Sequence, residues 1–243
     1  MHKLLVITLL FYCAIVNADD VIDITYFISD KSSAPIQIPS EDSGIVTDVL
    51  KKTAMPDVNL IYKTLPFKRM IQTLEESKTP WITYGSAKWP DLRANNLSVT
   101  PLMTVRHVLM TRAETPYNSI GEIIDTGIVL IRGFNYPGLI DYINNKPKKV
   151  VYVKTHEAAI KMVLAGRVGA FPGMDLRLTY HLKKLSIERA TITLHDFSDI
   201  IPNYDVNLSF SNDFPKANRD SIESQLYNLK KTGQLGTILQ KYK

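Results

Sequence analysis

Side chains that could serve as nucleophiles, bases or metal ligands are present, but they do not follow the spacing of a known catalytic motif. The chain has no GxSxG turn, no HExxH pair, no GxxxxGK[ST] phosphate loop and no GxGxxG turn. The histidines that follow the N-terminal leader, His107, His156, His181 and His195, lie far apart without metal-ligand spacing. We therefore predict no catalytic residue, no metal site and no cofactor, and we interpret each histidine as a surface or packing residue. A Ser-His-Asp triad assembled by folding stays open, because geometry defines it.

The charged residues exclude one class of partner. The 243 residues include 29 Lys and Arg and 24 Asp and Glu, so the formal net charge is +5, and the two signs alternate through most of the chain. The densest basic run, Lys146 to Lys149, contains no interleaved aromatic residue and is typical of a solvated turn. We exclude nucleic acid as a partner.

The first eighteen residues have the features of a cleavable signal peptide. Lys3 provides a positive charge, an apolar run extends from Leu4 to Val16, and Ala18 ends a segment of small residues. The apolar run is shorter than the roughly 20 residues that a membrane-spanning helix needs. We predict cleavage after Ala18 and export to the periplasm. Since Cys13 is the only cysteine, the mature chain then has no disulfide.

Apolar periodicity predicts strands that alternate with helices. Helical stripes follow most of the strand-like runs, and two helices close the chain after Pro215. Parallel strands need crossover connections, so this alternation indicates parallel sheets in two separate α/β units. The predicted strands span residues 24–28, 58–62, 81–84, 127–131, 150–153, 168–171 and 205–210.

Local signals predict where several helices begin. Asp42 or Ser43 can cap the helix that follows, and Ser119 can form a capping box with Glu122. Thr155 can cap another helix, and Pro137 can open the helix that carries Leu139 and Ile143. No Gly/Ser linker joins the two units, so we expect short ordered crossings near 104–111 and 201–207.

Several sequence landmarks carry a resemblance to a known family. They are WPDLRANNLSVTPL within 81–112, LAGRV at 164–168 and the closing NLKKTGQLGTILQKYK. In this order and spacing, the chain resembles bacterial extracellular solute-binding protein family 3, the periplasmic polar amino-acid-binding proteins of ABC importers. The likeness covers nearly the whole chain after the leader.

The resemblance implies a type II periplasmic binding protein fold. This is an α/β fold of two lobes, each a mixed, mainly parallel sheet flanked by helices. The first lobe would comprise residues 19–106 and 204–243, the second residues 107–203, and the signal peptide residues 1–18. The two crossings between the lobes would form the hinge, and we expect a monomer.

The resemblance also implies which residues contact the ligand. Arg93 matches the family arginine that binds an amino-acid carboxylate, and a planar guanidinium suits two parallel hydrogen bonds to a carboxylate. Ser86 matches a nearby hydroxyl, and the turn after the strand at 127–131 matches a ligand-contacting turn at the carboxyl end of a strand. The expected contacts are Arg93, Ser86, Tyr26, Trp89, Arg132, Gly133, Phe134, Asn135 and Asp175.

The chain departs from the family pattern where an ammonium group would bind. Family members normally carry an aspartate at the position of Gly169, and the acid expected shortly afterwards is displaced, with Asp175 as the nearest substitute. If no acid faces the cleft, the ligand lacks an ammonium group and is a simple carboxylate or another anion. Lys88, Arg93 and Arg132 would suit such an anion.

The function that the resemblance implies is capture without chemistry. The lobes would close on a small polar ligand, an amino acid or related carboxylate, and an inner-membrane ABC permease or a receptor would recognise the closed state. A sensor with the same fold is an alternative. So is an enzyme similar to cyclohexadienyl dehydratases, which need an acid in the cleft. A third alternative is an interaction module that has lost small-molecule binding.

Overall fold

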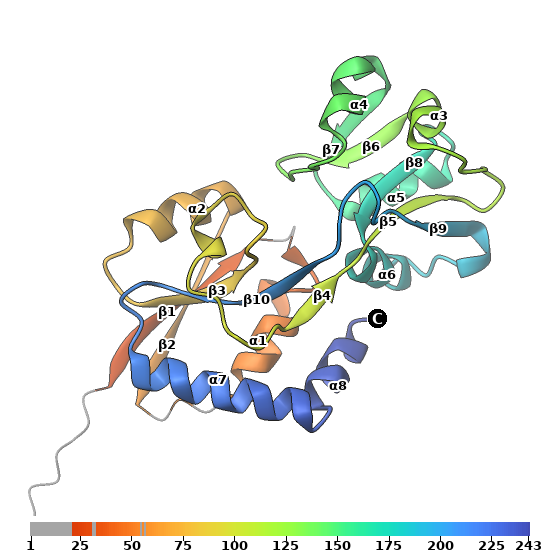
Figure 1. The fold of residues 1–243 in the computed structure, drawn as a ribbon. Helices are drawn as coiled ribbons and strands as arrows, with labels where there is room; N and C mark the ends of the chain where they lie inside the picture. The colour runs from red at the N-terminus through yellow and green to blue at the C-terminus, as the bar shows by residue number, and fades with distance from the viewer. Residues whose placement is uncertain (1–20, 31–32, 54, 56) are drawn as a thin grey trace, which may run out of the picture.

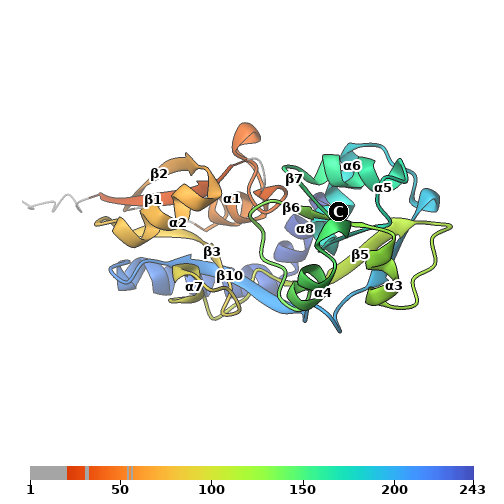
Figure 2. The same ribbon diagram turned by 90° about the horizontal axis from the view of Figure 1, so that it is seen from above.

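The computed structural model describes residues 21–30, 33–53, 55 and 57–243. The predicted signal peptide, its cleavage site and Cys13 lie outside the described residues. Within them, the chain forms two five-stranded sheets, each with its own helices, that lie side by side (Figures 1 and 2). We call the first sheet with its helices lobe 1 and the second lobe 2.

Lobe 1 combines segments from both ends of the chain. Its elements are β1 (Ile22–Ser29), α1 (Ile45–Leu50), β2 (Val58–Leu65), α2 (Phe67–Glu76), β3 (Trp81–Gly85), β4 (Met103–Val105), β10 (Tyr204–Phe210), α7 (Lys216–Lys231) and α8 (Gln234–Lys241). The strand order is β2-β1-β3-β10-β4. β1 pairs in parallel with β2 and β3, whereas β10 runs antiparallel to β3 and β4.

Lobe 2 is built from the middle of the chain. Its elements are β5 (His107–Arg112), α3 (Ile120–Asp125), β6 (Ile128–Ile131), α4 (Ile140–Asn145), β7 (Val150–Val153), α5 (His156–Leu164), β8 (Ala170–Met174), α6 (Asp175–Lys184) and β9 (Ile192–Asp196). The strand order is β7-β6-β8-β5-β9. β6 is parallel to β7 and β8, and β5 is antiparallel to β8 and β9. Each lobe is therefore a mixed sheet flanked by helices, as the fold class predicted.

The chain passes between the lobes twice. β4 leads into β5 through Arg106, and the segment 197–203 links β9 to β10. Figure 1 shows β4, β5 and β10 extending across the junction. Two short crossings that lie together permit one lobe to rotate relative to the other, because few backbone dihedral angles have to change.

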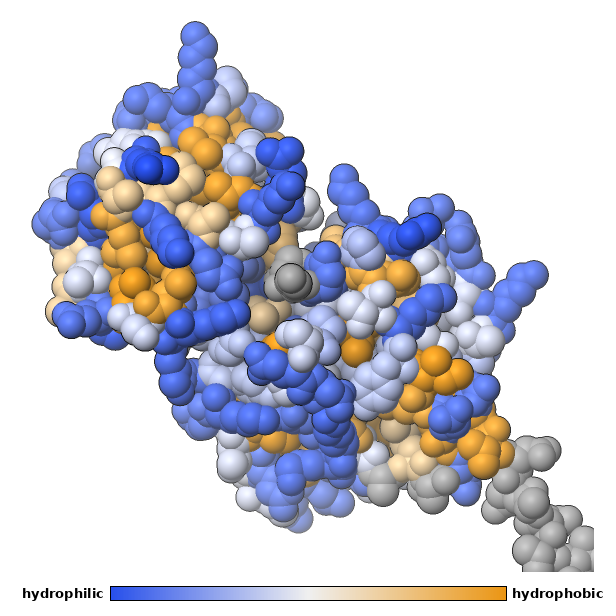
Figure 3. All heavy atoms as spheres, turned by 180° about the vertical axis from the view of Figure 1, so that it is seen from behind, coloured by the Kyte–Doolittle hydropathy of each residue, from blue (hydrophilic) through white to orange (hydrophobic). Residues whose placement is uncertain are grey.

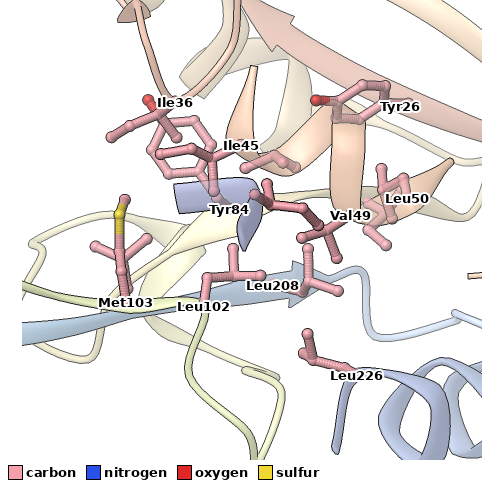
Figure 4. Packing of buried hydrophobic residues seen from close by; sticks show 14 of the residues in the cluster. Tyr26, Ile36, Ile45, Val49, Leu50, Tyr84, Leu102, Met103, Leu208 and Leu226 are labelled. Carbon is pink, nitrogen blue, oxygen red and sulfur yellow. The ribbon is translucent and has the colours of Figure 1, made fainter. Parts of the chain in front are cut away.

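The core of lobe 1 lies on both faces of its sheet. Successive residues of a strand point to opposite faces, so Tyr26 and Ile28 pack towards α1 while Phe27 packs with α2. Figure 4 shows Ile45 and Val49 of α1 meeting side chains of the sheet such as Leu208. Each fully buried side chain of this size contributes roughly 1.5–3 kcal/mol. This packing makes lobe 1 rigid enough to hold the loops at its edge in fixed positions.

The core of lobe 2 follows the same alternation. Val129 and Ile131 of β6 pack in the cluster that contains α5 and α6 residues. Ile128 and Leu130, between them in the sequence, pack in the cluster with α3 and the α4 entry. A strand that is buried on both faces appears in the sequence as a continuous apolar run, which is how β6 was predicted.

Two of the predicted helix starts are wrong. Gly44 occupies the N-cap of α1 with a φ of 116°, and its backbone approaches Gln37 too closely for a side chain, so neither Asp42 nor Ser43 caps the helix. α4 begins at Ile140 rather than at Pro137, because Gly138 adopts a φ of 81° that is incompatible with a helix.

Other local predictions are confirmed. The Ser119 and Thr155 hydroxyls accept hydrogen bonds from the backbone amides of Glu122 and Ala158, 3.3 and 3.2 Å away. β7 spans the predicted residues 150–153, whereas the strand predicted at 168–171 forms later, as β8. β4, β5, β9 and α6 were not predicted, and residues 104–111, expected to form a crossing, belong mostly to β4 and β5. The polar residues of α6 are a large part of its buried face, which obscured its apolar stripe.

Candidate functional site

Strand register brings the carboxyl ends of the parallel strands of both sheets to the junction between the lobes. In lobe 2, the last residue of β8, Met174, pairs with His107, which directly follows the first crossing. In lobe 1, Tyr204 at the start of β10 pairs with Val105, which directly precedes that crossing. Ligands of open α/β sheets bind beyond the carboxyl ends of the strands. Figure 3 shows an indentation of the surface between the two lobes.

Arg93 lies in a buried turn at the lobe 1 side of this junction. Its Nε and Nη2 atoms donate to the two carboxylate oxygens of Asp91 at 2.9 and 2.8 Å, and only 4% of its side chain is exposed. The guanidinium carbon lies 4.3 Å from the ring centre of Trp89 and 4.9 Å from that of Phe67. A ligand carboxylate could be received only by the other edge of the guanidinium, formed by Nη1 and Nη2.

A tight turn holds two other predicted residues of lobe 1, Ser86 and Trp89, beside Arg93. The Ser86 carbonyl accepts a hydrogen bond from the Trp89 amide at 3.0 Å, and the Ser86 hydroxyl accepts one from the Lys88 amide at 3.4 Å. Gly85 allows this turn, because a Cβ atom there would lie 1.8 Å from the carbonyl oxygen of Arg93. Ser86, Trp89 and Arg93 are therefore brought together.

Tyr26 is placed elsewhere. Its side chain is fully buried in the core of lobe 1, where its hydroxyl bonds to Thr47 at 2.9 Å and accepts from Gln37 at 3.1 Å (Figure 4). Burial raises the pKa of its hydroxyl, with the hydrogen bonds from Thr47 and Gln37 opposing this rise. Its ring supports the sheet under the junction and does not line the surface.

The turn after β6 carries the predicted residues of lobe 2. Arg132 and Asn135 are exposed, and Gly133 adopts a φ of 87° with open space around its Cα. Phe134 alone turns inward, with its ring centre 5.8 Å from that of His156 and 5.3 Å from the guanidinium carbon of Arg177. The polar side chains of this turn are thus exposed to solvent, whereas the ring of Phe134 packs inside lobe 2.

Asp175 links α6 to the first crossing. Its carboxylate accepts from Arg106 at 2.6 Å, and its backbone amide donates to the Arg106 carbonyl at 2.9 Å. Thr179 also donates to this carboxylate, at 3.3 Å. Because its oxygens are used in this way, Asp175 acts on the hinge and is a poor acceptor for a ligand ammonium group.

Sequence reasoning missed a group of buried polar residues on the lobe 2 side of the junction. Arg177 of α6 is 4% exposed, and His107 is 8% exposed with its ring centre 5.6 Å from that of Tyr204. His156 and His181 stack with ring centres 4.8 Å apart and planes 7° from parallel. The separation of these residues in the sequence hid their contact. The available signal was the helical spacing of Arg177 and His181 beside Leu178 and Leu182.

The histidines of this group are neutral near pH 7. Burial, together with the smaller effect of the Arg177 charge, lowers the pKa of His107 to about 4. Burial and Arg177 also lower the pKa of His156 well below its ordinary value. Burial lowers the pKa of His181, against the opposing effect of the Glu157 carboxylate 3.1 Å away. Arg177 is therefore the charged member of a group that otherwise offers neutral hydrogen-bonding atoms.

We expect the protein to lose stability as the pH falls from about 6.5 to 4. In the unfolded chain His107 takes up a proton near pH 6.5, whereas in the folded chain its pKa is about 4. Folding thus opposes protonation, and this residue alone should cost about 3 kcal/mol by pH 4. Urea unfolding at several pH values measures the effect. The loss should be smaller in His107→Asn, and an identical loss in that variant would contradict the assignment.

The described residues hold no group of three or more side chains suited to bind a metal ion. No helix within the described ranges is both long and apolar enough to cross a membrane.

Comparisons with known proteins identify the fold. No family model matches the chain. No curated protein matches it. Solved structures similar to it include one from work on glutathione import through GshT and the cystine ABC importer TcyBC of Streptococcus mutans, with a TM-score of 0.72, 18% identity and coverage of 91% of this chain and 94% of that one.

Two further similar structures are a ligand-binding core and a sensor domain. The GluR0 ligand-binding core from Nostoc punctiforme in complex with L-glutamate has a TM-score of 0.64, 18% identity and coverage of 91% of this chain and 98% of that one. A histidine kinase sensor domain with similarity to periplasmic binding proteins has a TM-score of 0.66, 15% identity and coverage of 92% and 96%. These matches confirm the two-lobed type II fold and, at the level of fold, the resemblance to solute-binding proteins.

Proposed function

We propose that this chain is a periplasmic substrate-binding protein that captures a small polar ligand, an amino acid or related carboxylate, and delivers it to an ABC permease. The observation that carries the proposal is the strand register at the junction, which brings the carboxyl ends of the parallel strands of both lobes to two short crossings. The similar structure from work on an ABC importer supports the transport role.

The mechanism is closure of the lobes about the crossings. Ligand contacts made by both lobes favour the closed state, since a ligand shifts an equilibrium towards the state that it binds better. Lobe 1 would contribute Ser86, Trp89 and Arg93, and lobe 2 would contribute the turn from Arg132 to Asn135. The Arg106–Asp175 ion pair keeps α6 attached to the first crossing during this motion.

A sensor is the second candidate function, and the similarity to a histidine kinase sensor domain favours it. The same closure would then be recognised by a membrane receptor rather than by a permease. The genes that lie beside this one distinguish the two roles, because a permease gene indicates import and a kinase or receptor gene indicates sensing.

An enzymatic role has less support. A dehydratase of this fold would need a proton donor in the cleft. Two carboxylates beside the junction, Asp91 in lobe 1 and Asp175 in lobe 2, each accept hydrogen bonds from an arginine. We expect no turnover of prephenate or arogenate, which an absorbance assay of the aromatic product would measure.

We expect a thermal-shift panel of amino acids, organic acids and polyamines to identify a binding compound. A ligand at 100 times its Kd adds about 2.7 kcal/mol to stability, which for a chain of this size raises Tm by roughly 5–10 °C. Binding should also change tryptophan fluorescence through Trp89, which is half-buried at the junction.

The two tryptophans provide a control for this experiment. Trp81 is 2% exposed in the lobe 1 core. The Trp81→Phe variant should keep the fluorescence change and Trp89→Phe should lose it. A panel in which no compound stabilises the protein would contradict the binding role.

A further inference from the structure

A buried positive charge lies at the edge of lobe 2 that faces the junction. Arg177 belongs to the first turns of α6, directly after the carboxyl end of β8. Its guanidinium packs against Phe134 from the β6 edge. Burial, and after it the charge of Arg177, lower the pKa of His107 and His156, and the same charge opposes the rise that burial causes in the pKa of Tyr204. The field of Arg177 thus reaches side chains of both lobes, among them His107 and Tyr204, which directly follow the two crossings.

Neutral hydrogen-bonding groups lie within this field. The Nδ1 atom of His107 is buried and has no hydrogen-bond partner in the described structure. An unsatisfied buried polar atom destabilises the folded state, so such an atom calls for an explanation. Tyr204, against which the His107 ring packs, is mostly buried, and its ring centre lies 6.3 Å from that of Trp89 in lobe 1. A ligand group here would contact both lobes.

The carboxylates on α6 and at the start of α5 already have cationic or imidazole partners, and Asp196, at the end of β9, accepts hydrogen bonds from the amide and hydroxyl of Ser198. Asp175 binds Arg106 at 2.6 Å. Glu157, at the start of α5, lies 3.1 Å from His181 and 3.7 Å from Lys184. Neither is placed to receive a ligand ammonium group, so the chemistry of this edge favours an anion.

We propose that Arg177, His107 and the Tyr204 hydroxyl form an anion-binding pocket at the hinge, and that the ligand is an organic acid whose carboxylate is bound there. This inference rests on the proposed function, because it assigns the ligand class and a binding group to the same junction. His107 follows one crossing and Tyr204 follows the other. An anion that binds both residues therefore holds the two crossings in one arrangement and favours closure.

Isothermal titration calorimetry tests the proposal with succinate, glutarate, L-glutamate, L-arginine, spermidine and glucose as probes. We expect succinate or glutarate to bind the wild-type protein. Arg177→Gln should weaken that binding roughly 10- to 100-fold, as expected for loss of a hydrogen bond to a charged group. Tyr204→Phe, which removes one oxygen atom and is expected to fold, should weaken it about 3- to 10-fold. Arg189→Gln, at an exposed arginine of lobe 2, should bind like the wild-type protein.

Each of the other possible outcomes contradicts a specific part of the proposal. Equal affinity in wild type and Tyr204→Phe, together with equal affinity in a folded Arg177→Gln variant, overturns the pocket. Binding of only L-glutamate, L-arginine, spermidine or glucose overturns the ligand class while the binding role stands. If no probe binds, the ligand class is again overturned, and the wider thermal-shift panel then decides separately on the proposed function. Circular dichroism of each variant confirms that it is folded.

Discussion

Replacement of Arg93 by alanine should lower the free energy of unfolding by about 3–5 kcal/mol, because removing one partner leaves the other as an uncompensated buried charge. That other partner is Asp91, whose side chain is 15% exposed and bound to Arg93 through both oxygens. The contacts with Trp89 and Phe67 are lost as well. If Arg93 binds the ligand, affinity should also fall by about 2–5 kcal/mol. Urea unfolding and calorimetry measure the two effects.

A double variant separates the two roles of Arg93. Replacing Asp91 by asparagine in the Arg93→Ala background removes the uncompensated charge, so part of the lost stability should return. Binding should stay weak if Arg93 contacts the ligand. Recovery of both stability and affinity would show that Arg93 only shapes the turn, and an Arg93→Ala variant as stable as the wild type would contradict the importance of the ion pair.

Gly85→Ala should destabilise the protein by roughly 3 kcal/mol or more and abolish ligand binding, because overpacking against a rigid backbone forces the structure to shift. The new Cβ atom would lie 1.8 Å from the Arg93 carbonyl oxygen and 2.7 Å from its carbon, and backbone atoms cannot move aside like the end of a flexible side chain. The turn that carries Ser86, Trp89 and Arg93 must then open. Thermal unfolding and the fluorescence titration of Trp89 measure both effects.

Gly236→Ala is the matched control. Gly236 lies in α8, and no atom comes within 4 Å of a Cβ atom built there. Alanine in a helix is favoured over glycine by roughly 0.8–1 kcal/mol, so this variant should be slightly more stable and should bind normally. If Gly85→Ala were as stable as Gly236→Ala, the close packing of the turn would be disproved.

The lobe 1 part of the candidate site was predictable because it is local. Ser86, Trp89 and Arg93 all lie within residues 86–93, between β3 and the end of a short 3-10 helix at Leu92–Ala94, so they stay close to one another in the chain. The contacts that these three side chains make in the folded protein were not predictable. The pairing of Arg93 with Asp91 and its cover by Trp89 and Phe67 depend on how α2 packs beside β3. Likewise, Tyr26 lies at a strand position that the sequence alone cannot orient towards the core or the junction.

The features that the sequence determined by itself depend on interactions between residues close together in the chain. The apolar run of β6, the Thr155 cap of α5 and the alternation of strands with helices act over a few residues each, and they specify an α/β chain of two units. The pocket formed by Arg177, His107 and Tyr204 depends instead on strand order and register, which bring together elements that are distant in the chain. Polar side chains carry no periodic signal of their partners, so only the tertiary structure decides which of them meet.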